Sequence, residues 1–123
     1  GLDAWVEPIE ENILKQGLNI PSLLLRSESW ETGINNDYIN QLIINSNLLP
    51  MYYQINGTTH FDFAMVYMYS PLTKVIGFSG ELDKNYLTDM LRTMILDYFD
   101  EYLLNHDRGF NVSSWKEAMM INE

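Results

Sequence analysis

Two side chains in the sequence have the types and the order that acid–base catalysis needs. His60 follows a turn containing Gly57, which itself follows the strand-like run 51–55. Open α/β sheets place their active sites at the carboxyl ends of their strands, so this histidine is well placed to reach a cleft. Asp3 comes earlier in the chain, and a carboxylate can hold an imidazole in the tautomer that accepts a proton. We therefore expect His60 to be a general base and Asp3 to be the acid that orients it.

The nucleophile that such a pair would serve is missing from the sequence. In α/β-hydrolases the chain order is Ser, Asp, His, and only two residues precede Asp3. No serine lies in a Gly-x-Ser-x-Gly motif, and the nearest match, 77–81, has Glu81 in place of the last glycine and is predicted to be a turn. Three other serines lack a supporting context: Ser27, Ser29 and Ser70. We therefore expect the serine and its oxyanion hole to come from a preceding segment or from a second chain.

Each candidate also has an ordinary structural explanation. His60 can be a loop histidine that bonds the backbone, and Asp3 can be a turn residue at the end of a strand. Asp62 competes with Asp3 for the acid role, but a side chain two residues away rarely reaches its neighbour's imidazole correctly, so Asp62 ranks below Asp3. His106 follows the long C-terminal helix and is interpreted as a surface histidine, since the dipole at a helix C-terminus favours positive charge.

Composition limits the classes of function. The chain has 123 residues, 46% of them hydrophobic and 20% charged, which suits one globular domain. Its net charge is -10 with only 7 Lys and Arg, which offers no basic patch to nucleic acid or to an anionic membrane surface. There are no cysteines and only 2 histidines, and no glycine-rich phosphate loop follows a strand. We therefore expect no metal and no cofactor, and the sequence leaves the compartment open.

Strands and helices alternate along the sequence. Continuous apolar runs bounded by prolines predict strands, and apolar residues at three- and four-residue steps predict helices. The expected strands are 2–6, 21–28 and 51–55, and the expected helices are 35–47 and 82–105, the latter capped by Asp83. This order predicts an α/β fold with about three mainly parallel strands flanked by helices.

The remaining segments are less regular. Residues 10–18 are expected to form a polar loop or a short helix, and 57–62 a loop that carries His60. Residues 61–76 are rich in methionine and aromatic side chains, and a short helix is expected there before Pro71. This segment packs in the core or forms an acyl-binding or lipid-facing wall. The tail from residue 111 is expected to supply a cap and two packing side chains: Ser113 or Ser114, then Trp115 and Met119.

Four short motifs occur in a fixed order along most of the chain. They are Gly1-Leu2-Asp3-Ala4-Trp5 with Pro8, Arg26-Ser27-Glu28, Gly57-Thr58-Thr59-His60 with Phe63, and Gly80-Glu81-Leu82-Asp83. Each motif alone is weak, but their order and spacing together are fairly specific. In this combination the sequence resembles the C-terminal part of the plasma-type platelet-activating factor acetylhydrolases and their microbial relatives.

The resemblance implies an α/β-hydrolase fold and a calcium-independent serine esterase that removes short acyl chains from phospholipid-like esters. In that family Asp3 matches the acid of the catalytic triad and His60 matches the base. The segment 65–76 is similar in position to one that faces lipid aggregates. The sequence departs from the family pattern where Ala64 and Met65 stand in place of an acidic residue, and in lacking the nucleophile.

Two hypotheses follow for the function. In the first, residues 1–123 form a single partial α/β-hydrolase domain, the acid and base half of an esterase that acts through a serine supplied elsewhere. In the second, the chain is a non-catalytic binding or interaction module that keeps the half-fold. Under both, strands taken from a larger sheet expose an edge and an apolar surface, so the isolated chain is expected to self-associate as a dimer.

Overall fold

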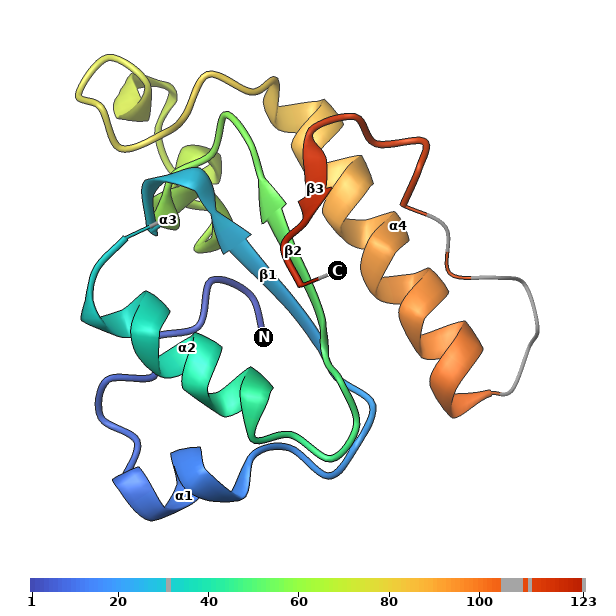
Figure 1. Ribbon diagram of the computed structural model, residues 1–123. Coiled ribbons are helices and arrows are strands. Elements are labelled where there is room, and N and C mark those ends of the chain that lie inside the picture. The colour runs from blue at the N-terminus through green and yellow to red at the C-terminus, as the bar shows by residue number, and fades with distance from the viewer. Residues whose placement is uncertain (31, 105–109, 111, 123) are drawn as a thin grey trace.

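The structure is a computed structural model that describes residues 1–30, 32–104, 110 and 112–122. Helices and strands alternate along the chain, with short 3₁₀ turns (η) between them (Figure 1). In chain order the elements are α1 (Glu11–Gln16), β1 (Leu23–Ser27), η1 (Glu28–Trp30), α2 (Ile34–Ile44), β2 (Met51–Ile55), α3 (His60–Phe63), η2 (Val66–Met68), η3 (Pro71–Thr73), α4 (Lys84–Leu103) and β3 (Ala118–Met120). The architecture is therefore α/β in character, as the sequence predicts.

The described strands form one mixed sheet in the order β1-β2-β3. β1 and β2 run parallel, with a register that pairs Leu23 with Met51 and Ser27 with Ile55. β3 adds to the other side of β2 in the antiparallel sense, so that Ala118 faces Ile55. Because β1 and β2 end at the same edge, the residues that follow them, η1 and α3, come together there.

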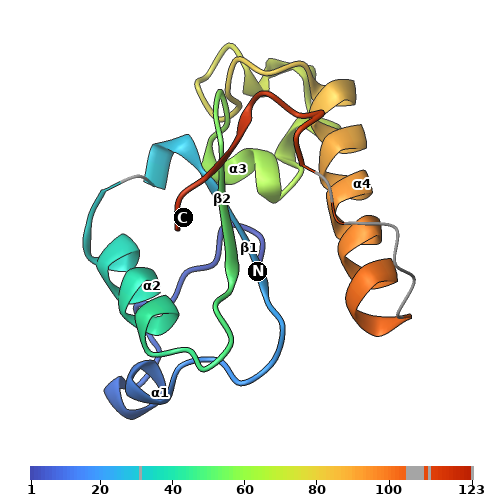
Figure 2. The same ribbon diagram turned by 45° about the vertical axis from the view of Figure 1, so that its right-hand side comes forward.

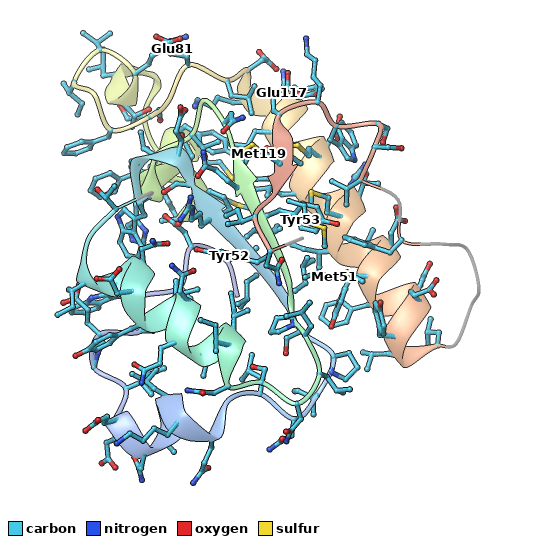
Figure 3. All side chains as sticks on the ribbon, in the orientation of Figure 1. Met51, Tyr52, Tyr53, Glu81, Glu117 and Met119 are labelled. Carbon is cyan, nitrogen blue, oxygen red and sulfur yellow. The ribbon has the colours of Figure 1, made fainter. Side chains whose placement is uncertain are left out.

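Helices cover both faces of this sheet, as the two views show (Figures 1 and 2). Alternate residues of a strand point to opposite faces, and the neighbouring Tyr52 and Tyr53 of β2 follow that rule (Figure 3). Tyr52 packs in a small core with Ile39 and Ile43 of α2. Tyr53 belongs to the larger core under α4. The two helices therefore bury the apolar side chains of both faces, as the continuous apolar runs predict.

The long helix is the element that the sequence predicts best. Asp83 caps it, since its side chain accepts a hydrogen bond from the Tyr86 N–H at 3.0 Å. The inward stripe is buried along the first four turns, at Leu87, Met90, Leu91, Met94 and Tyr98. Two other apolar residues of the predicted stripe are not covered near the end of the helix, since Phe99 is 47% exposed and Leu103 is 68% exposed. The C-terminal half of α4 thus carries more apolar surface than the described sheet covers.

The N-terminal segment departs from the prediction of a strand over 2–6. Only Leu2 pairs with β1, in a parallel bridge to Leu25. The chain then turns at Asp3, whose φ of +44° lies in the left-handed region and cannot continue a strand. The expected set of three mainly parallel strands is therefore corrected to two parallel strands and one antiparallel strand.

The tail supplies that antiparallel strand. Trp115 packs against the larger core and meets the Tyr86 ring edge-on at 5.4 Å. Met119 does not pack as expected, because its place in β3 turns it outward and leaves it 49% exposed (Figure 3). The predicted packing of the tail is thus right for Trp115 and wrong for Met119, and in the described tail no helix follows Ser113 or Ser114 for either to cap.

Candidate active site

Asp3 and His60 meet at the carboxyl edge of the sheet. Oδ2 of Asp3 lies 2.9 Å from Nδ1 of His60, although 57 positions separate the two residues in the chain. The Asp3 side chain is fully buried, whereas 41% of the His60 side chain is exposed. A carboxylate accepts hydrogen bonds, so the Nδ1 atom carries the proton and donates it to Asp3. Within the described part of the chain no hydrogen bond to the opposite nitrogen, Nε2, is present.

The Asp3 carboxylate is held in place by Ser27, the last residue of β1. The backbone N–H of Ser27 donates to Oδ1 at 2.7 Å, and its hydroxyl donates to Oδ2 at 2.7 Å. The backbone N–H of Asp3 in turn donates to the Leu25 carbonyl at 2.6 Å. These bonds offset the cost of burying the carboxylate. Ser27 is wholly buried, so its hydroxyl supports the acid and does not reach a substrate.

His60 occupies the first position of α3, and the prediction that it lies within a loop is corrected here. Thr59 precedes it with an extended conformation, and the Asp62 carboxylate accepts from the Thr59 N–H at 2.8 Å. This hydrogen bond gives a partner to a backbone N–H at the start of the short helix. The helical turn fixes the backbone of His60 and so sets where its side chain leaves the chain, while the contacts of the ring set its orientation.

Asp62 faces away from His60 and toward α4. Its buried carboxylate accepts from Lys84 Nζ at 2.9 Å and from the Gly80 N–H at 2.8 Å. Burial alone raises the pKa of Asp62, but the bonds from Lys84, Thr59 and Gly80 outweigh it and hold the pKa below its ordinary value. These contacts agree with the ranking of Asp62 below Asp3 as the partner of the histidine.

Aromatic rings surround the imidazole of His60. The Trp30 indole stacks on it with ring centroids 4.4 Å apart and an angle of 2° between the planes. Phe61 meets the imidazole edge-on at 6.0 Å and itself stacks on Phe78 at 4.8 Å. Trp30 carries no sequence signal of its own that marks it as part of the site. A tryptophan three residues after the end of β1 indicates a neighbour of His60 only once β1 and β2 are known to pair, because that pairing brings the two segments together.

The arrangement has the chemistry of a general base. With Nδ1 protonated and bonded to Asp3, the neutral ring presents an acceptor lone pair at Nε2. The hydrogen bonds of the three serines set aside in the sequence go elsewhere than His60, since Ser27 and Ser29 bond each other at 3.0 Å and Ser70 caps η3. Ser79 lies in the turn predicted for 77–81 and bonds Thr73. His106 lies outside the described residues.

Within the described ranges no three histidine or acidic side chains lie close enough together to hold a metal ion. Among the same residues no helix combines the length and the apolar character needed to cross a membrane.

Comparison with known proteins supplies the family. Residues 1–120 match the sequence model of the family described as platelet-activating factor acetylhydrolase, isoform II. Because this match covers nearly the whole chain, the protein belongs to that family. It is thereby related to phospholipid acetylhydrolases, as the order of its motifs indicates. No curated protein gave a significant match.

Proposed function

We propose that the chain is the acid and base half of a serine esterase that removes short acyl chains from phospholipid-like esters. The observation that carries this proposal is the 2.9 Å contact between buried Asp3 and half-exposed His60. A carboxylate on Nδ1 with Nε2 turned outward is the arrangement that prepares an imidazole to accept a proton from a nucleophile. Membership of the acetylhydrolase family supports a phospholipid-like ester as the class of substrate.

The proposed mechanism assigns a distinct step to each side chain. Nε2 of His60 takes the proton of a serine hydroxyl while the serine oxygen bonds to the acyl carbon. Asp3 stabilises the imidazolium that forms and keeps its orientation. The imidazolium then returns the proton to the leaving oxygen as the ester bond breaks. Water releases the acyl group from the serine in a second round, in which His60 again accepts and returns the proton.

The serine comes from outside these 123 residues, in a preceding segment or in a second chain. The hydrogen bonds between the N-terminal residues and the outer edge of β1 support this part of the proposal. The Gly1 nitrogen donates to the Leu23 carbonyl at 2.6 Å, and the Leu25 N–H donates to the Gly1 carbonyl at 2.9 Å. This is the bond pattern of a parallel strand. A hollow of about 540 Å³ continues past that edge, lined by apolar side chains of β1 and α4. A further strand fits the pattern, and residues 1–123 then form one partial α/β-hydrolase domain.

A surface beside His60 supports a lipid-like substrate. The segment 65–78 exposes a run of large apolar side chains: Met68, Tyr69, Leu72, Val75, Ile76 and Phe78. Exposed apolar groups in such number mark a contact surface. We assign this surface to contact with phospholipid aggregates, in line with the position of the segment in the family.

The decisive experiment is to replace His60 in the polypeptide that also contains the serine. His60→Ala is expected to lower kcat on p-nitrophenyl acetate by about 10³-fold or more, because the serine then has no base. The matched control is His106→Ala, the only other histidine in the chain, which is expected to keep full activity. Activity that survives the removal of His60 overturns the proposal.

The alternative is a non-catalytic module that keeps the half-fold. One observation favours it, since among the described residues no serine forms a hydrogen bond with the imidazole. The gene sequence upstream of Asp3 distinguishes the two functions. The esterase requires Gly-x-Ser-x-Gly about 20 to 30 residues before Asp3, because one helix and one strand occupy that distance. Labelling with a fluorophosphonate probe also distinguishes them, because the probe labels the complete esterase at that serine and leaves a non-catalytic module unlabelled.

A further inference from the structure

We propose that Trp30 is a positioning residue for His60. Its indole fixes the plane of the imidazole, so that Nε2 points in one direction while Asp3 holds Nδ1. The inference rests on the proposed function, since it concerns how the base of that reaction is aimed. The observation is the parallel stack of the two rings, with centroids 4.4 Å apart and an interplanar angle of 2°.

The bond to Asp3 does not by itself fix the imidazole. A single hydrogen bond constrains the distance and direction at Nδ1, but the ring can still rock about the line between the two atoms. Terminal torsions of histidine are broad, so the side chain has no sharp preference of its own. Rocking moves Nε2, the atom that lies across the ring. A flat surface parallel to the imidazole opposes that movement, and the Trp30 indole is such a surface.

Trp30 can act in this way because its own backbone is fixed. It ends the turn η1, which follows β1 without a gap. In the same turn the Glu28 carboxylate accepts the Gly57 N–H at 2.8 Å and so ties η1 to the segment that leads into His60. Ser27, one residue before the turn, binds the Asp3 carboxylate. One stretch of four residues therefore contacts the acid, the backbone before the base, and the ring of the base.

The remaining contact on the ring does not replace the indole. Phe61 meets the imidazole edge-on at 6.0 Å with an angle of 65°, and a phenyl edge at that angle leaves the ring free to rock. With 41% of the His60 side chain exposed, solvent offers no restraint either. Loss of the indole is therefore expected to misplace Nε2 without disturbing Asp3.

The test compares three variants of the serine-containing polypeptide. Trp30→Leu is expected to lower kcat on p-nitrophenyl acetate by about ten- to a hundredfold, with KM within about threefold of wild type, because misplacement by one ångström costs about that much. Trp30→Phe keeps an aromatic face and is expected to recover most of kcat. Trp115→Leu removes another indole contact, on Tyr86 and away from His60, and controls for a general loss of stability.

Two kinetic outcomes overturn the inference. One is an unchanged kcat in folded Trp30→Leu. The other is an equal loss of kcat in Trp30→Leu and Trp115→Leu, since that pattern reports destabilisation alone.

A spectroscopic readout on the chain itself separates this inference from the proposed function. A stacked indole shifts the imidazole proton resonances of His60 upfield, and a His60→Gln spectrum identifies those signals. We expect the upfield shift to disappear in Trp30→Leu and to persist in Trp115→Leu. An upfield shift that is absent from wild type overturns the inference, whether or not the enzyme is active. An inactive wild-type esterase with the shift present overturns the proposed function and leaves the stack intact.

Discussion

Lys84 Nζ lies 2.9 Å from Oδ1 of Asp62, and this ion pair joins the helical turn that begins at His60 to the first residue of α4. The other oxygen of Asp62 accepts the N–H groups of Thr59 and Gly80 at 2.8 Å. One buried carboxylate therefore ties together the residue before the base, the loop ahead of α4, and the helix itself. The position of His60 depends on this junction as well as on Asp3.

Removing the cation is predicted to weaken the whole junction. In Lys84→Met the Asp62 carboxylate stays buried without its counter-ion. We expect the free energy of unfolding to fall by about 2–3 kcal/mol, below the value for a fully buried pair, because 24% of the Lys84 side chain is exposed and two N–H groups still hold the carboxylate. Denaturant titration measures this loss. Lys15→Met removes the exposed pair with Glu11 and should change little.

The same carboxylate makes stability depend on acid pH. The pKa of Asp62 in the folded protein lies below its unfolded value of about 3.9. A depressed folded pKa contributes stability above the unfolded pKa, and that contribution is lost as the pH falls through the folded pKa. The difference in unfolding free energy between wild type and Asp62→Asn should therefore be constant above about pH 5 and shrink below about pH 4. A difference that stays the same at both ends of this range contradicts the assignment.

The Ser27 hydroxyl is predicted to stabilise the fold through its hydrogen bond to the Asp3 carboxylate. Ser27→Ala removes a 2.7 Å bond to a buried carboxylate, so we expect a loss of about 1.5–3 kcal/mol in unfolding free energy. Ser22→Ala is the matched control, because the Ser22 hydroxyl bonds the Ile20 carbonyl at the surface, and a change of only about 0.5 kcal/mol is expected there. Thermal or chemical unfolding compares the two. Equal effects would show that the bond to Asp3 carries no special weight.

Two glycines near the site are predicted to respond differently to alanine. A Cβ on Gly80 would lie 2.1 Å from the Gly57 carbonyl oxygen, so Gly80→Ala must push away the turn that leads to His60. A Cβ on Gly77 meets nothing within 4 Å, and Gly77→Ala bears only the strain of its φ of +76°, about 1–2 kcal/mol. We expect the His60 resonances to move in Gly80→Ala and to stay in place in Gly77→Ala. The reverse pattern would contradict the packing described here.

The chain by itself is predicted to self-associate. Residues 1–3 bond along the outer edge of β1, so the open side of the sheet lies along this short segment, and the apolar side of α4 near Phe99 is uncovered. Light scattering over a range of concentrations should show a dimer or a larger species, and a charge on the outermost segment, as in Leu2→Lys, should shift the population toward monomer. A monodisperse monomer for wild type at all concentrations would be evidence against an open edge.

Local signals in the sequence were sufficient to predict β1, β2 and α4. The runs that became β1 and β2 are continuous and apolar, and α4 repeats its apolar side chains over five turns with Asp83 as its cap. β3 was missed because Ala118, Met119 and Met120 are helix formers by intrinsic propensity, and only pairing with β2 makes them a strand.

The site was predictable in part for a similar reason. The order of an acid and a histidine, together with the position after a strand, was enough to select Asp3 and His60. Their contact depends on the parallel pairing of β1 and β2, as do the roles of Ser27 and Trp30. No local pattern marks a serine as the support of a distant carboxylate, so those two residues emerge only from the three-dimensional arrangement.

The register of the sheet also limits how the site can vary. Leu2, β1 and β2 are adjacent in the sheet, and Asp3 follows the first of them while His60 follows the third. Neighbouring strands of a sheet lie about 4.8 Å apart. The distance between Asp3 and His60 is therefore set by the spacing of the strands and not by the length of the loops. Insertions between residues 31 and 50 leave that span unchanged, whereas a slip of one residue in β1 would turn Ser27 to the opposite face. The connecting segments are thus free to diverge around a fixed pair.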